Sequence, residues 1–138
     1  MSGSAAAGPR QGESPANTEE PAPLEAPLFF VVSLSKQQVS VYTPKGLYTQ
    51  SPVSTGQPGH PTPRGIFTIL GKELYHESNI YSGAPMPFMQ RITYTGVAMH
   101  EGYLPGYPAS HGCIRLPVSF AKKLYSVTDV GTPVYIGA

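Results

Sequence analysis

Apolar residues along this chain occur in short runs that are separated by turn-forming residues. Residues 28–32 form a continuous apolar run with the length of a buried strand. Residues 38–42 alternate between polar and apolar, and residues 43–46 supply turn chemistry before a return strand at 47–53, as in a β-hairpin. The same reasoning predicts further strands at residues 65–70, 89–94, 97–100 and 134–136.

One segment has helical spacing. Pro117 suits the first position of a helix, and the residues after it predict a short helix with one apolar face. That face is expected to carry Val118, Ala121, Leu124 and Tyr125. The predicted fold is therefore mostly β, sandwich-like, with a single short helix near the C-terminus. The abundance of Gly (15) and Pro (16) among 138 residues agrees with a fold rich in turns.

Residues 71–88 show no clean period. A loop of this length inside a compact domain is often a binding loop or a lid. It carries several aromatic residues, and we expect Tyr75 and Tyr81 to contact a substrate there. The alternative is that these side chains only cover the core.

The N-terminal segment differs from the rest. Residues 1–27 are rich in Ala, Pro, Ser, Gly and Glu, with Leu24 as the one large aliphatic residue before the first strand. Such a segment cannot bury enough surface to offset its ordering entropy, so we predict a disordered linker at 1–27 and one domain at 28–138. Residues 1–10 lack the apolar core of a signal peptide, and the sequence predicts no transmembrane span. A formal net charge of +1 without a basic cluster indicates no nucleic-acid partner.

The candidate chemistry lies between residues 100 and 116. The only cysteine, Cys113, follows His111 and Gly112 directly, and His100 ends a predicted strand upstream. A free thiol is only a few per cent thiolate at neutral pH, and a nearby imidazole can take its proton. Gly112 lets the backbone approach a substrate closely, and its amide, with that of Cys113, can point at a developing oxyanion.

These residues resemble the signature of the YkuD-type L,D-transpeptidases. The signature has an upstream His, a variable loop, then Ser/Thr-His-Gly-Cys, an aliphatic residue and usually Arg or Asn. Residues 110–116 read Ser-His-Gly-Cys-Ile-Arg-Leu, and residues 97–100 read Val-Ala-Met-His. A Thr-Pro-x-Gly stretch at 62–65, after Ser-Thr-Gly at 54–56, extends the resemblance across residues 28–138. The loop between the two motifs is short for the family, so the resemblance does not predict the shape of the acceptor side of the site.

The resemblance implies a role for each matching residue. Cys113 matches the nucleophile and His100 the base, with the backbone carbonyl of Glu101 orienting the imidazole. His111 matches a second histidine near the sulfur. Arg115 matches a residue that helps hold the site or a substrate carboxylate, and Ser110 belongs to the same substrate-binding segment.

The resemblance also implies a reaction. Cys113 would attack a peptidoglycan stem tetrapeptide, release D-Ala and form a thioester, which an amine acceptor resolves. The expected enzyme is thus a cysteine-dependent L,D-transpeptidase of cell-wall biogenesis. No metal or organic cofactor is expected, carbapenem-type inhibitors should acylate the cysteine, and the periplasm or cell envelope is the expected location.

Four other interpretations remain open at this stage. Water as the acceptor would make the enzyme an L,D-carboxypeptidase. A non-catalytic wall-binding module would need neither nucleophile nor base, and many cysteine peptidases of other clans place the Cys before the His. A zinc site built from His100, His111 and Cys113, with His76 or Glu101, lacks the usual ligand spacing.

Overall fold

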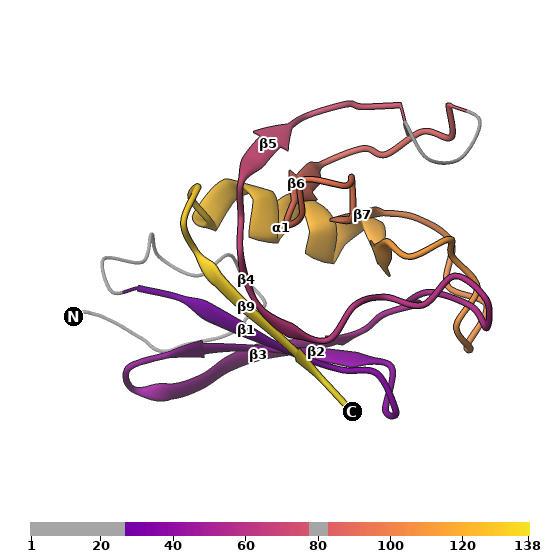
Figure 1. Cartoon of the computed structure of the whole chain (residues 1–138). Coiled ribbons are helices and arrows are strands. Elements are labelled where there is room, and N and C mark those ends of the chain that lie inside the picture. Colours follow the sequence, from indigo (N-terminus) through magenta and orange to yellow (C-terminus); the bar gives the residue numbers. More distant parts are fainter. Residues whose placement is uncertain (1–26, 78–82) are drawn as a thin grey trace.

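The computed structural model describes residues 27–77 and 83–138. It contains two β-sheets and one α-helix, and the helix lies above the larger sheet in Figure 1. The prediction of a mostly-β fold with one short helix is confirmed. The predicted linker at 1–27 lies almost wholly outside the described residues.

The larger sheet has five strands in the order β3-β2-β1-β9-β4. Its neighbours pair antiparallel except β1 and β9, which run parallel. The first and last strands of the described residues therefore lie side by side within this sheet. The strands are β1 (Phe29–Ser33), β2 (Gln38–Thr43), β3 (Gly46–Pro52), β4 (Gly65–Thr68) and β9 (Pro133–Gly137).

The smaller sheet has four strands in the order β5-β6-β7-β8. The pair β7–β8 is parallel, and the other pairs are antiparallel. The strands are β5 (Gly71–Glu73), β6 (Met89–Arg91), β7 (Ala98–Glu101) and β8 (Ile114–Leu116). Two of them were missed in the sequence: β5 lies in the segment predicted as a loop, and β8 follows Cys113 directly.

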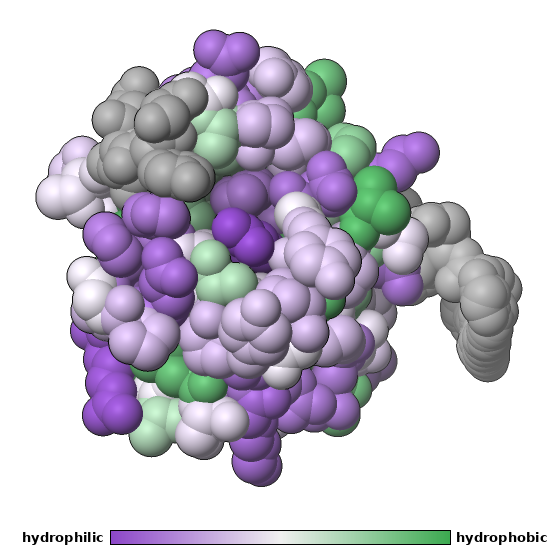
Figure 2. Space-filling model, turned by 90° about the vertical axis from the view of Figure 1, so that its right-hand side faces the viewer, coloured by the Kyte–Doolittle hydropathy of each residue, from purple (hydrophilic) through white to green (hydrophobic). Residues whose placement is uncertain are grey.

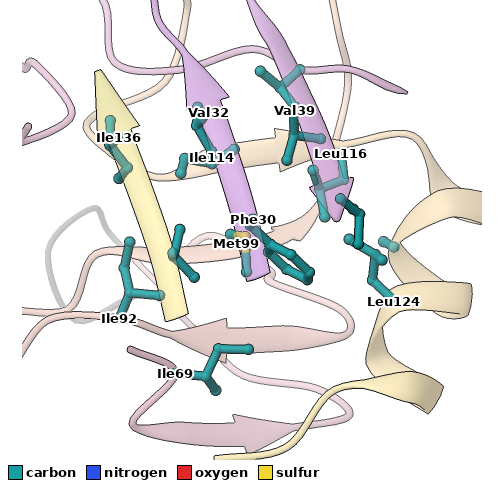
Figure 3. Close-up of a cluster of buried hydrophobic side chains, with 14 of the residues drawn as sticks. Phe30, Val32, Val39, Ile69, Ile92, Met99, Ile114, Leu116, Leu124 and Ile136 are labelled. Atoms are coloured by element: carbon teal, nitrogen blue, oxygen red, sulfur yellow. The ribbon is translucent and has the colours of Figure 1, made fainter. Parts of the chain in front are cut away.

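One hydrophobic core joins the two sheets and the helix (Figure 3). Alternate residues of the central strands point into it, as a half-buried sheet requires. Its largest fully buried apolar side chains are Phe30, Ile69, Met99, Ile114, Leu116, Leu124 and Ile136. β7 and β8 each bury one face here, which fixes the direction of the side chains on their other face.

The helix α1 (Val118–Val127) begins after Pro117, as predicted. Its buried residues are Phe120, Ala121 and Leu124, whereas Val118 is 60% exposed. The predicted apolar face was therefore wrong at its first position, because Phe120, not Val118, turns toward the core. This helix is too short and too polar to cross a membrane, and it is the only one among the described residues.

Candidate active site

The parallel pair β7–β8 brings His100 and the Cys113 segment together. Met99 pairs with Ile114 and His100 with Arg115. Met99 and Ile114 are fully buried in the core. Since successive side chains of a strand point to opposite faces, His100 and Arg115 project from the other side of the ladder. Cys113 precedes β8 by one residue, so it lies on the same side as Arg115.

A cavity of about 380 Å³ opens on this side. Figure 2 views the molecule from the side where the loops at 53–64 and 102–113 lie in Figure 1, and polar residues predominate in its middle. The cavity is large enough for part of a peptide. Its lining is Ala84, Pro85, Met86, Pro87, His100, Glu101, Gly102, Tyr103, Ser110, His111, Cys113 and Arg115.

His100 is held in one tautomer. Its Nδ1 lies 2.8 Å from the carbonyl oxygen of Glu101, and because a carbonyl can only accept, Nδ1–H is the donor. Nε2 therefore carries the lone pair that a base needs. Burial lowers the pKa of His100; its hydrogen bond to the Glu101 backbone opposes this shift, and the charge of Arg115 adds to it. The imidazole is accordingly neutral at neutral pH.

Cys113 is 7% exposed, and its Sγ lies 3.8 Å from the carbonyl oxygen of Gly96. Burial raises the pKa of the Cys113 thiol, while a backbone hydrogen bond with Ala98 and the charge of Arg115 oppose the rise. The shifts of Cys113 and His100 thus both favour the uncharged forms. Both shifts act against the ion pair that transfer of the Cys113 proton to His100 would produce.

A tight turn presents Cys113. Gly112 has φ +124°, a conformation that side chains with a Cβ rarely adopt. Its N–H donates to Ser110 Oγ at 3.1 Å, and the Ser110 hydroxyl donates to the carbonyl of Cys113. The Gly112 amide, which we expected to face an oxyanion, is therefore engaged with Ser110 in this structure. Ser110 itself lines the cavity and is buried.

His111 also lines the cavity, and its ring packs against the ring of His60. The centroids are 4.4 Å apart and the planes are tilted by 45°. His60 is exposed to solvent, but its ring also covers one side of His111. Only the tertiary structure reveals this contact, because about fifty positions separate the two residues.

Arg115 connects the site to the loop that precedes it. Its guanidinium donates to the carbonyls of Tyr103 at 3.4 Å and Ala109 at 3.5 Å, and its side chain lines the cavity. The stem of Arg115 packs beside Gly102, where a Cβ would come within 3.0 Å of it. Arg115 thus holds the 102–109 loop and places a positive charge beside the thiol.

Neither of the two tyrosines that we expected to contact a substrate is among the described residues that line the cavity. Tyr75 is 58% exposed and does not line the cavity, and Tyr81 lies outside the described residues. From the same segment, residues 84–87 form one wall of the cavity. The segment 71–88 was predicted as a binding loop, but the sequence did not single out residues 84–87 or Tyr103 as site residues.

The structure gives no support for the zinc interpretation. Across the described ranges 27–77 and 83–138, no three His, Cys, Asp or Glu side chains lie close enough to hold a metal ion. The features of this site that can support a reaction are the thiol of Cys113, the imidazole of His100 and the cavity that both of them line.

Comparison with known proteins agrees with this geometry. The family model described as YkuD, an L,D-transpeptidase catalytic domain, matches residues 27–136. Probable L,D-transpeptidase 3 of Mycobacterium tuberculosis is 33% identical over 103 residues, which are 62% of this chain and 37% of that protein. L,D-transpeptidase 1 of the same species is 29% identical over 126 residues, or 79% of this chain and 50% of that protein. The chain therefore spans half or less of the length of these relatives.

Solved structures give the same result. An L,D-transpeptidase from Mycobacterium smegmatis superposes with a TM-score of 0.75 at 27% identity, covering 82% of this chain and 59% of that one. An L,D-transpeptidase solved in complex with imipenem has a TM-score of 0.73 at 26% identity, with 81% and 59% covered. L,D-transpeptidase 3 from M. tuberculosis, solved with a faropenem-derived adduct, has the same score and identity, with 82% and 61% covered.

Proposed function

Because this chain belongs to the YkuD family of L,D-transpeptidase catalytic domains, we propose that it transfers acyl groups between peptidoglycan stem peptides through a thioester on Cys113. The observation that carries this proposal is the position of the chain's single thiol. It lies in one cavity with a buried histidine whose Nδ1 is already committed to a backbone carbonyl. Binding alone requires neither a thiol nor an oriented base.

Acylation begins with the neutral pair. His100 Nε2 takes the proton of the Cys113 thiol as the sulfur attacks the carbonyl carbon of the third stem residue. The tetrahedral intermediate collapses when the peptide C–N bond breaks and the leaving amine of D-Ala takes the proton from His100. The acyl group then remains on Cys113 as a thioester.

Deacylation runs the same steps with a new nucleophile. An acceptor amine gives its proton to His100 and attacks the thioester carbonyl, and Cys113 leaves with that proton as a thiol. Water in place of the amine gives the carboxypeptidase reaction. The Arg115 guanidinium at the cavity is suited to a carboxylate of either stem peptide.

The proposal extends to inhibitors and location. Relatives were solved with imipenem and with a faropenem-derived adduct, and we expect carbapenems to acylate Cys113 here. No step above needs a cofactor. A peptidoglycan substrate places the working site in the periplasm or cell envelope.

Intact-protein mass spectrometry tests the proposal. Wild-type protein is incubated separately with a disaccharide-tetrapeptide and with imipenem, and we expect a covalent adduct with each. Cys113→Ala should form none, and His100→Gln should form adducts about 10²–10⁴-fold more slowly, the usual contribution of a general base. Tripeptide and cross-linked products separate hydrolysis from transfer. Folded wild-type protein with a free thiol that forms no adduct would refute the proposal.

A further inference from the structure

The loop that follows β3 packs against the turn that presents Cys113. The N–H groups of Ala109 and Ser110 both donate to the carbonyl of Thr55, at 2.9 and 3.0 Å, and the N–H of Gln57 donates to the carbonyl of Ser110 at 2.9 Å. Residues 54–62 thus form a backbone frame around residues 109–113. The frame comes from the larger sheet, whereas His100 and Arg115 come from the smaller one.

Thr62 is the side chain that connects this frame to the nucleophile segment. It is 4% exposed, and its hydroxyl accepts from the N–H of Gly56 at 2.9 Å and donates to the carbonyl of Gly112 at 2.7 Å. The frame is tight, since a Cβ on Gly56 would lie 2.0 Å from the carbonyl oxygen of His60. The position of the Thr62 hydroxyl is therefore well determined.

The Gly112 carbonyl belongs to the same peptide unit as the Cys113 N–H. In a planar trans peptide these two groups point in opposite directions. When Thr62 holds the carbonyl on its own side, the N–H of Cys113 must point away from Thr62. Cys113 lines the cavity and Thr62 does not, so an N–H that points away from Thr62 is suited to face a carbonyl bound in the cavity.

The tether matters because a glycine precedes the nucleophile. Gly112 has the freedom to rotate its peptide unit, and its own N–H is committed to Ser110 Oγ. Within the described part of the chain the Cys113 N–H has no hydrogen-bond acceptor, so this donor is available for an oxyanion. We infer that Thr62 is a positioning residue whose hydroxyl fixes the Gly112–Cys113 peptide and so aims the Cys113 N–H at the oxyanion of acyl transfer. This inference rests on the proposed function.

The test compares two reactions of the same thiol. Imipenem acylation passes through an oxyanion, whereas alkylation by iodoacetamide does not. In Thr62→Val, which removes the hydroxyl but keeps the shape, we expect acylation to slow by about 10–10³-fold, the upper part of this range being the effect of losing one oxyanion donor. Alkylation should change by less than about 3-fold. Thr62→Ser keeps the hydroxyl and should acylate within about 3-fold of wild type.

The outcomes separate clearly. Equal loss of acylation in the valine and serine variants would show that packing of the methyl group matters instead, and the inference would fail. Wild-type acylation in Thr62→Val, or in Thr62→Ala if valine prevents folding, would also overturn it. Parallel losses in acylation and alkylation would mean that the thiol itself has moved, which again contradicts it. Absence of any wild-type adduct refutes the proposed function rather than this inference.

Discussion

At the scale of single residues, the resting charge of the active-site pair determines how the enzyme starts its reaction. Burial lowers the pKa of His100 and raises that of Cys113, so moving the proton from sulfur to nitrogen in the empty site is costly. We therefore expect the pair to stay uncharged until a substrate carbonyl is in place, with His100 acting as a general base during attack rather than as the partner of a preformed thiolate.

This view predicts the pH dependence of alkylation. Because burial raises the pKa of Cys113, its thiolate forms only at higher pH than in a free cysteine, whose thiol titrates near pH 8.5. The rate constant for iodoacetamide alkylation should therefore keep rising above about pH 8.5, the midpoint of a free thiol. His100→Gln, which cannot act as the base, should leave this profile almost unchanged. A plateau already reached near pH 7 would instead show a thiolate–imidazolium pair.

At the scale of elements, the sequence predicts the strands and helices that are long enough to show a hydrophobic period. The hairpin β2–β3 and the strands β1 and β9 are long enough for alternation or a continuous apolar run, and all were found. β5 and β8 have three residues each, too few for any period, and both form only because a neighbouring strand pairs with them. The frame around Thr62 could not be predicted from the sequence either, because its hydrogen bonds join residues about fifty positions apart.

The candidate site divides in the same way. Cys113 and His100 were identified because their residue types and order carry chemistry that can be read without a structure. The contact of His60 with His111 and the engagement of the Gly112 amide depend on three-dimensional packing. Tyr75 was expected near the substrate because it is an aromatic residue in a loop. The structure places it outside the cavity lining, so its contact with a substrate stays a prediction.

One prediction concerns how β5 supports α1. Lys72 on β5 donates to the carbonyls of Tyr125 and Thr128 at 2.6 and 2.7 Å, and its ammonium lies 4.4 Å from the centroid of the Tyr125 ring. A cation at a helix C-terminus satisfies exposed carbonyls and opposes the helix dipole. Lys72→Met should lower the free energy of unfolding by about 1–3 kcal/mol in urea denaturation, the range for charged hydrogen bonds. Lys122→Met, an exposed position on the same helix, is the control and should change it by less than about 0.5 kcal/mol.

At the scale of the whole molecule, the two sheets contribute different parts of one site. The smaller sheet carries His100 and Arg115, while the loop from the larger sheet frames the turn before Cys113. An antiparallel bridge between Ser54 and Arg115 joins the two, with backbone hydrogen bonds of 3.1 and 2.8 Å. Because folding buries His100 and Cys113 and shifts the pKa values of both side chains, their protonation is linked to the stability of the fold.

That linkage gives a prediction for global stability against pH. The folded state holds the pKa of His100 below its unfolded value near 6.5, so the unfolded chain binds its proton first. The contribution of neutral His100 to the free energy of unfolding is fully present above about pH 6.5, and it falls as the pH drops toward the folded-state pKa of His100. The raised pKa of Cys113 has the opposite effect. The contribution of its neutral thiol to stability is fully present below the unfolded thiol pKa near 8.5, and it is lost as the pH rises through the folded-state value.

The free energy of unfolding, measured by urea denaturation across this range, should therefore be highest between these limits. His100→Gln should flatten the acid side alone and Cys113→Ala the alkaline side alone, so that each variant is the control for the other. Acid and alkaline slopes that are the same in all three proteins would show that other groups set the pH dependence of folding.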